Sequence, residues 1–214
     1  MKILVTGFEP FGRAVINPAY EAVKLLPDVI AGAEVIKIEI PTVFGRDEEV
    51  VRAAVEKHHP DAVLCVGQAG GRSGITVEKV AINLMEARIP DNEGRQPIDT
   101  PIREDGENAY FSSLPVKCMV QYMKEAKIPA RVSYTAGTFV CNDIMYRVLY
   151  MIDKEYPHMR GGFAHVPYLP EQTLDLPEGT PCMPAEMIAK ALECSVRAIV
   201  ENEEDVKTVS GETH

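Results

Sequence analysis

Short β-branched runs alternate with helical stretches along most of this chain, and this alternation limits the folds that it can adopt. Six runs are apolar or β-branched and are bounded by Gly, Pro or Asp, as strands are: Lys2–Thr6, Glu34–Ile40, Ala62–Val66, Ile75–Asn83, Arg131–Thr135 and Gly162–Val166. Between them, five stretches carry helical periodicity: Pro18–Leu26, Arg46–His58, Pro115–Ala126, Asn142–Glu155 and Pro184–Glu201. Since helices between strands favour parallel pairing, we expect an α/β three-layer sandwich with a mostly parallel sheet covered by helices on both faces.

The chain length and two irregular segments predict the domain organisation. With 214 residues, the chain is long enough for one domain with one sizeable core. We expect this domain at residues 1–202 and an acidic, flexible tail at 203–214. The run Ile75–Asn83 follows another strand across a glycine loop, which indicates that part of the sheet is antiparallel. The polar segment Pro90–Leu114 is too long for a routine connection and is typical of a lid or a mobile excursion.

Composition excludes several classes of protein. The net charge is −10, and the lysines and arginines form no dense run, which argues against nucleic acid and anionic membranes as partners. No run of about 18 apolar residues is present, so we expect no membrane span. The opening Met1–Pro10 reads as a first strand rather than a signal peptide, which predicts a cytoplasmic protein. The five cysteines include no Cys-x-x-Cys pair, so we expect free thiols and no zinc site.

Cys141 is the most informative single residue. It lies in Ser133-Tyr-Thr-Ala-Gly-Thr-Phe-Val-Cys-Asn142, between a β-rich run and the predicted start of a helix. Unpaired N–H groups and the positive end of the helix dipole favour the thiolate there, and the thiolate is the nucleophilic form of cysteine. The alternative is a small buried apolar side chain, which most cysteines of this kind are. Position alone does not decide between them.

A histidine and a glutamate supply the partners that a nucleophilic thiol needs. In parallel sheets, sites form where strands deliver their carboxyl ends, and we expect Cys141, His165 and Glu78 to converge at that edge. Taken singly, His165 reads as a buried histidine bonded to a carbonyl, and Glu78 as an exposed strand residue paired with lysine. Together, His165 would lower the pKa of the thiol by about 2 units and protonate a leaving amine. Glu78 would orient the imidazole, and the Cys141 backbone N–H would bind an oxyanion.

Four longer motifs resemble those of the type I pyroglutamyl peptidases, also called pyrrolidone-carboxylate peptidases. Gly67-Gln-Ala-Gly-Gly-Arg72 running on to Ile75-Thr-Val-Glu-Lys-Val-Ala-Ile-Asn83 resembles the family's glutamate signature. Ala136-Gly-Thr-Phe-Val-Cys-Asn142 resembles its cysteine signature, and Gly162-Phe-Ala-His-Val-Pro-Tyr-Leu-Pro-Glu-Gln172 its histidine segment. The opening Val5-Thr-Gly-Phe-Glu-Pro-Phe-Gly12, followed by Asn17-Pro18, is similar to its N-terminus. The likeness extends over roughly residues 1 to 200.

This resemblance implies a cytosolic cysteine peptidase that removes an N-terminal pyroglutamyl residue from peptides through a thioacyl intermediate. Cys141 would be the nucleophile, His165 the general base and acid, and Glu78 the orienting carboxylate. The family's apolar ring pocket falls on Phe8, Phe11, Thr42, Ile89, Phe139 and Val140. Gln68 lies in the loop that meets the lactam, and Arg88 would assist the oxyanion. The family is commonly a homotetramer without metal or organic cofactor. Aromatic walls with a few amide hydrogen bonds also suit a neutral lactam.

Two other classes of function stay open at this level. The loop Gly67–Arg72 could cradle an anion with its glycines and arginine, as in a phosphate- or nucleotide-binding protein such as a phosphorylase. It matches neither a dinucleotide-binding nor a Walker A pattern, and this hypothesis leaves Cys141 and His165 without a role. A non-catalytic homologue used for binding is the third class. It is not favoured while all three chemical residues are present.

Overall fold

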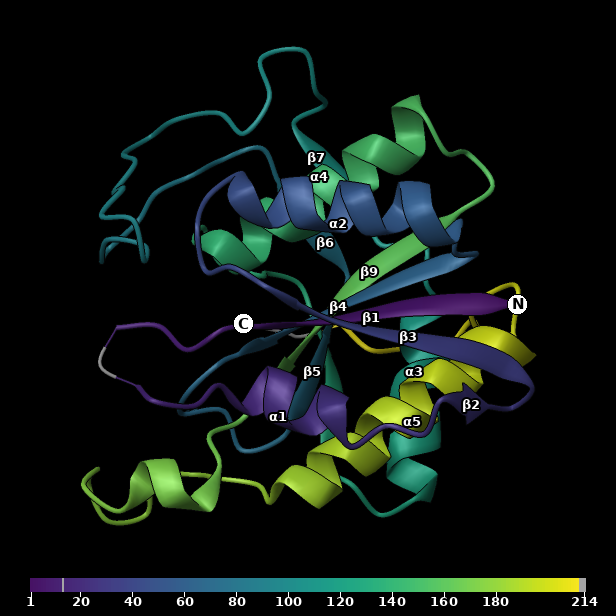
Figure 1. Ribbon diagram of the computed structural model, residues 1–214. Helices are drawn as coiled ribbons and strands as arrows, with labels where there is room; N and C mark the ends of the chain where they lie inside the picture. The colour runs from purple at the N-terminus through teal and green to yellow at the C-terminus, as the bar shows by residue number, and fades with distance from the viewer. Residues whose placement is uncertain (13, 212–214) are drawn as a thin grey trace.

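The computed structural model describes residues 1–12 and 14–211, and in them a seven-stranded mixed sheet lies between two layers of helices (Figure 1). The strand order is β2-β3-β1-β4-β9-β5-β8. The strands are β1 (Lys2–Phe8), β2 (Val29–Ile30), β3 (Ala33–Ile40), β4 (Ala62–Gln68), β5 (Ile75–Glu78), β8 (Ala130–Ser133) and β9 (Arg160–Val166). This confirms the predicted α/β sandwich with a mostly parallel sheet.

Three strands of the main sheet run opposite to the other four, and one of them is the short edge strand β2, which pairs with β3 in the antiparallel sense. β1, β3, β4 and β9 are parallel, but β5 pairs with β9 in the antiparallel sense and with β8 in the parallel sense. The predicted antiparallel part is therefore present. The single strand expected at Ile75–Asn83 is wrong, because the chain leaves the main sheet after Glu78. The following β6 (Val80–Ile82) pairs with β7 (Ala109–Phe111) in a separate two-stranded sheet.

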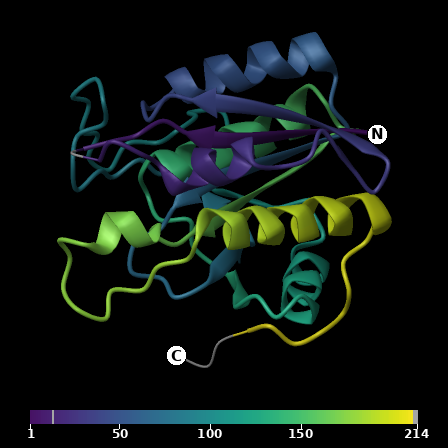
Figure 2. The same ribbon diagram turned by 60° about the horizontal axis from the view of Figure 1, so that its bottom comes forward.

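Alternation along the strands produces two separate cores. In β1, Ile3 and Val5 face one helical layer, while Leu4 and Phe8 face the other. The first layer holds α1 (Pro18–Lys24), α3 (Val116–Glu125) and α5 (Ala185–Glu201). The second layer holds α2 (Arg46–His58) and α4 (Val140–Lys154). Figures 1 and 2 show the sheet between these layers. Strands buried on both faces explain the nearly continuous apolar runs in the sequence.

Three short elements were not predicted from the sequence. They are β2, β7 and the 3-10 helix η1 (Pro170–Thr173). β7 lies inside the segment Pro90–Leu114, which is therefore not wholly irregular. These elements have two to four residues, too few for a periodic pattern to develop.

The segment after α5 contacts the body of the protein. The Asp205 carboxylate accepts hydrogen bonds from the backbone N–H groups of Lys117 (3.0 and 3.1 Å) and Cys118 (3.0 Å) in the first turn of α3. Pro115, at the N-cap of α3, makes no side-chain cap hydrogen bond, so Asp205 supplies the missing acceptor. Figure 2 shows this segment passing α3. Flexibility of 203–214 stays a prediction, and residues 212–214 lie outside the described part.

Among the described residues, no helix combines the length and the apolar character that a membrane crossing requires.

We expect Asp205→Ala to lower the free energy of unfolding by about 0.5–2 kcal/mol, because two N–H groups of α3 lose their acceptor. For a chain of this size, each kcal/mol corresponds to a decrease of about 2–4 °C in Tm. Thermal denaturation measures the change. Glu203→Ala is the matched control, since Glu203 is exposed. Equal Tm values for the two variants would show that Asp205 does not cap α3.

Candidate active site

The cysteine predicted as nucleophile lies in the first turn of α4, packed against the end of a central strand. Cys141 is half-buried, and its Sγ lies only 2.8 Å from the point that a Cβ atom on Gly67 would occupy. The Phe163 ring lies 2.7 Å from the same point, so a side chain at this position of β4 would displace the thiol or the ring. The helix begins at Val140, and its first N–H groups, including that of Cys141, have no intrahelical acceptor.

The histidine lies on the strand next to Gly67. His165 in β9 is the register partner of Gly67 in β4. It lies two residues after Phe163, and the centroids of their rings are 4.7 Å apart. Since Phe163 faces the layer of α2 and α4, the His165 ring lies on the face of the sheet that Cys141 covers. The structure thus brings the thiol and the imidazole to one place above Gly67.

The glutamate holds the histidine from the antiparallel neighbour strand. Thr76 pairs with His165 and Glu78 with Phe163, so Glu78 is a diagonal neighbour of His165. Its Oε1 lies 2.8 Å from His165 Nδ1 and 2.7 Å from Arg72 Nη1. A carboxylate oxygen accepts only, so Nδ1 carries the proton and Nε2 of the neutral ring is free to accept one. Glu78 is fully buried, and its interpretation as an exposed strand residue is wrong.

The route by which these groups meet differs from the prediction. We expected carboxyl ends of parallel strands to deliver all three residues to one edge. β5 and β8 run opposite to β9, so their carboxyl ends point away from that edge. Residues 134–139 bring the chain back from β8 to the start of α4 instead.

The protonation states also differ from the prediction. Burial raises the pKa of the Cys141 thiol, and the charge of Glu78 raises it further. Burial lowers the pKa of His165, although the hydrogen bond to Glu78 opposes this effect. Burial is the largest single influence on Glu78 and favours a higher pKa, but the hydrogen bond and charge of His165, together with hydrogen bonds from Ser133 and Arg72, outweigh it, so this pKa is lowered. These directions favour a neutral thiol, a neutral imidazole and an ionised carboxylate at neutral pH, and they are opposite to the expected lowering of the Cys141 pKa.

A small cavity of about 40 Å³ lies beside the thiol. Six of the seven predicted pocket residues line it together with Cys141 and Asn17: Phe8, Phe11, Thr42, Gln68, Phe139 and Val140. The Phe139 ring packs edge-on against Phe44, with 5.3 Å between ring centroids, and lies 6.5 Å from Phe11. The small volume suits one compact group, and the lining combines apolar walls with side-chain amides and a hydroxyl.

Asn17 lines the cavity but was not predicted to do so. Its Oδ1 accepts from Ala19 N–H at 3.1 Å, and its Nδ2 donates to the Glu9 carbonyl at 3.0 Å. It thus serves as N-cap of α1 and joins this helix to the loop after β1. An asparagine directly before Pro18 is a helix-start signal, which marks the cap but not the cavity.

Two predicted residues lie outside the cavity. Arg88 and Ile89 are exposed on the segment after β6. This segment is fixed to the loop before the nucleophile, because Thr138 Oγ1 donates to the Glu86 carbonyl at 2.7 Å and Glu86 N–H donates to the Thr138 carbonyl at 3.1 Å. Their roles toward substrate and oxyanion stay predictions.

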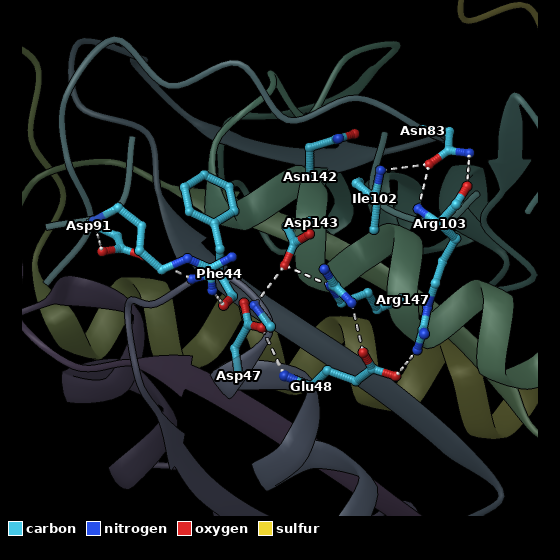
Figure 3. Close-up of polar contacts among 12 residues, drawn as sticks. Phe44, Asp47, Glu48, Asn83, Asp91, Ile102, Arg103, Asn142, Asp143 and Arg147 are labelled. Atoms are coloured by element: carbon cyan, nitrogen blue, oxygen red, sulfur yellow. Dashed lines mark hydrogen bonds and ion pairs between the residues drawn. The ribbon is translucent and has the colours of Figure 1, made fainter. Parts of the chain in front are cut away.

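A buried chain of ion pairs fixes α4 to α2 behind the cavity (Figure 3). Asp143, two residues after Cys141, accepts from Arg147 Nε at 2.8 Å and from Gly45 N–H at 3.2 Å. Arg147 Nη1 donates to Glu48 on α2 at 2.8 Å, and Arg103 Nη2 donates to the same carboxylate at 2.6 Å. The loop before α2, which carries Thr42 and Phe44, is therefore joined directly to the helix that carries the thiol.

The side chains of Asn142 and Asp91 add further hydrogen bonds around these ion pairs. The Asn142 side chain accepts from Ile82 N–H at 2.9 Å and donates to the carbonyls of Ile82 (2.9 Å) and Leu84 (3.0 Å). The Asp91 carboxylate accepts from Phe44 N–H at 3.1 Å. Figure 3 shows Asn142 above Asp143, and Asp91 to the left beside Phe44. No local pattern predicts these links between elements, because they join residues that are far apart in the sequence, such as Ile82 and Asn142 or Glu48 and Arg147.

The geometry does not favour an anion site at Gly67–Arg72. The Arg72 guanidinium is bonded to Glu78, and the Tyr168 ring fills the space where a side chain on Gly70 would lie. No group of three or more His, Cys, Asp or Glu side chains with the arrangement of a metal site occurs within residues 1–12 and 14–211. The arrangement suits attack by a thiol, with proton transfer through His165, on a compact group bound in the cavity.

Comparison with known proteins agrees with this chemistry. The pyroglutamyl peptidase family matches residues 1–202. The pyrrolidone-carboxylate peptidase of Enterococcus faecalis is 58% identical over 214 residues, covering 100% of both chains. That of Streptococcus pneumoniae is 59% identical over 215 residues, also with 100% of both chains covered.

Solved structures show the same likeness in three dimensions. Pyroglutamyl peptidase I from Bacillus amyloliquefaciens superposes with a TM-score of 0.94 and 48% identity, covering 97% of this chain and 99% of that one. A mutant pyrrolidone carboxyl peptidase from Pyrococcus furiosus gives a TM-score of 0.90 and 41% identity, covering 94% and 99%. This protein belongs to the pyroglutamyl peptidase family.

Proposed function

We propose that this protein is a pyroglutamyl peptidase that removes N-terminal pyroglutamate from peptides with Cys141, His165 and Glu78 as its catalytic triad. Membership of the family and the names of its relatives support the reaction. One observation carries the assignment of residues: Cys141 itself lines the small cavity beside the His165–Glu78 pair.

The first half of the reaction forms a thioester. His165 Nε2 removes the proton of the Cys141 thiol as Sγ attacks the carbonyl carbon that joins pyroglutamate to the next residue. The backbone N–H of Cys141 donates to the oxyanion that forms. The carbon–nitrogen bond then breaks, and His165 returns the proton to the leaving amine. A neutral resting pair suits this sequence, because the thiol and the imidazole exchange one proton only when substrate is attacked.

The second half releases the product. His165 removes a proton from water, and the hydroxide attacks the thioester carbonyl. The carbon–sulfur bond breaks, the thiol regains a proton, and free pyroglutamate leaves. Glu78 keeps Nδ1 protonated and stabilises the imidazolium in both halves.

The cavity gives the specificity. Pyroglutamate presents a neutral ring with one carbonyl and one N–H, and it carries no ammonium group. Phe8, Phe11, Phe139 and Val140 supply apolar walls, while Gln68 and Thr42 supply polar contacts. Arg88 and Ile89 are proposed to contribute from the adjacent segment. No carboxylate lines the cavity among the described residues, which disfavours a charged amino terminus.

Replacement of the nucleophile tests the mechanism. We expect Cys141→Ala and Cys141→Ser to lower kcat for pyroglutamyl-β-naphthylamide by about 10⁴-fold or more, since no thioester can form. Amine release under reducing conditions measures the rate, and Cys182→Ser, at an exposed cysteine, is the matched control. Near-native activity of Cys141→Ala in a folded protein would exclude the thioester mechanism.

Replacement of Glu78 tests the orienting carboxylate through the pH profile. Glu78 raises the pKa of His165 against the effect of burial, so Glu78→Gln lowers that pKa. Since protonated His165 cannot act as base, the acidic limb of kcat/KM should move to lower pH. At the same time kcat should fall by about 10²–10⁴-fold. Glu178→Gln, on an exposed loop, is the control. A limb that stays in place or moves to higher pH contradicts this role.

We also propose that the protein acts in the cytoplasm as a homotetramer. Its five cysteines are free thiols, as in proteins of reducing compartments. Phe111, Ile98 and Leu174 expose large apolar side chains, which fits an assembled protein. Light scattering should give four times 23.6 kDa, about 94 kDa. A mass of 23.6 kDa would exclude the tetramer, and cell fractionation with activity only in the membrane or exported fraction would exclude the cytoplasm.

A further inference from the structure

Gln172 lies outside the triad and the cavity, yet its side chain bonds to a residue of the cavity. It belongs to η1, which follows β9 and its histidine. Gln172 Nε2 donates to Gln68 Oε1 at 2.9 Å, and Gln172 Oε1 accepts from the backbone N–H of Leu169 at 2.9 Å. Both glutamines are half-buried.

These two hydrogen bonds fix the direction of both amide groups. A backbone N–H only donates, so the group of Gln172 that faces Leu169 is its oxygen. The group that faces Gln68 is therefore the NH2 of Gln172, and it requires an acceptor, which is Gln68 Oε1. We call the two hydrogen bonds from Leu169 N–H through Gln172 to Gln68 the relay. The NH2 group of Gln68 is its free end, with two N–H donors and no bond to Gln172. The backbone N–H of Leu169 thus determines which end of the Gln68 amide, oxygen or NH2, faces Gln172.

The surrounding backbone makes this relay stiff. Gln172 N–H donates to the Leu169 carbonyl at 3.0 Å, so main chain and side chain both fix the residue. Ala69 N–H, next to Gln68, donates to the Val166 carbonyl at 2.8 Å. The Tyr168 ring packs on Gly70, where a Cβ atom would lie 2.0 Å from Cζ of that ring. The loop after β4 and the segment after β9 therefore form one unit.

We propose that Gln172 is a positioning residue that orients the Gln68 amide so that its NH2 group donates to the ring carbonyl of the substrate. The inference rests on the proposed function, since it concerns recognition of the lactam. A ring carbonyl accepts only, and it requires a donor in the cavity. A reversed Gln68 amide would present an oxygen to that carbonyl, and the repulsion would weaken binding.

The variant Gln172→Glu reverses the relay while keeping the size of the side chain. One carboxylate oxygen still accepts from Leu169 N–H, and the other faces Gln68 and also accepts only. The Gln68 amide must then turn its NH2 group toward the new carboxylate. Gln172→Met removes the relay without imposing a direction. Glu171→Gln, at the exposed neighbouring position, is the matched control.

The experiment measures kcat and KM for pyroglutamyl-β-naphthylamide and the inhibition constant of 2-pyrrolidone, the bare lactam. For Gln172→Glu we expect KM and the inhibition constant to rise roughly tenfold to a hundredfold, the effect of one misdirected hydrogen bond. Gln172→Met should show a smaller rise, and Glu171→Gln none. The rate of Cys141 alkylation by iodoacetamide should stay unchanged, because the relay does not touch the thiol.

A second background shows whether the effect passes through Gln68. In Gln68→Met, which has no amide to turn, the further change Gln172→Glu should leave the inhibition constant unaltered. An equal rise in both backgrounds would overturn the proposal, as would an unchanged inhibition constant in Gln172→Glu alone. Failure of the proposed function gives a different result. In that case folded wild-type protein does not cleave the substrate, whereas failure of the positioning role leaves wild-type cleavage intact.

Discussion

The buried hydrogen bond between Glu78 and His165 is the interaction on which the rest of the site depends. Glu78 is fully buried, where an ionised carboxylate without partners would be strongly destabilised. His165 and Arg72 supply those partners at 2.8 and 2.7 Å. Because β5 runs antiparallel to β9, Glu78 reaches the imidazole diagonally across the sheet. The reversed strand pair therefore places the carboxylate within hydrogen-bond distance of the imidazole.

The same buried surroundings affect the ionisation of the Cys141 thiol. A helix start favours a thiolate, but burial and the negative charge of Glu78 favour the neutral thiol more strongly. Glu78 thus has two opposite effects: it makes His165 a better base and makes Cys141 a weaker acid. The proposed mechanism, in which a neutral thiol and a neutral imidazole exchange one proton during attack, is consistent with both effects.

The cavity depends on links between parts of the chain that are distant in sequence. Its walls come from the loops after β1 and β3, from the end of β4 and from the start of α4. The Asp143–Arg147–Glu48 chain joins two of these parts, and the Gln68–Gln172 relay joins a third to the segment after β9. Burying such groups is unfavourable unless each is paired, so these links also favour one relative placement of the elements over others.

Much of this could be predicted from local pattern. The sequence by itself determined the α/β class, the bounds of α2 and the choice of Cys141, His165 and Glu78 as candidates, because periodicity, turn residues and motifs are local properties. Most of the cavity lining followed from the resemblance to the family. Only the tertiary structure decided the reversed direction of β8, the burial of Glu78, the raised pKa of Cys141 and the direction of the Gln68 amide. Each of these follows from contacts between residues that are distant in sequence. The direction of a strand depends on the strands with which it pairs, and a pKa or an amide direction depends on the groups that packing places around it.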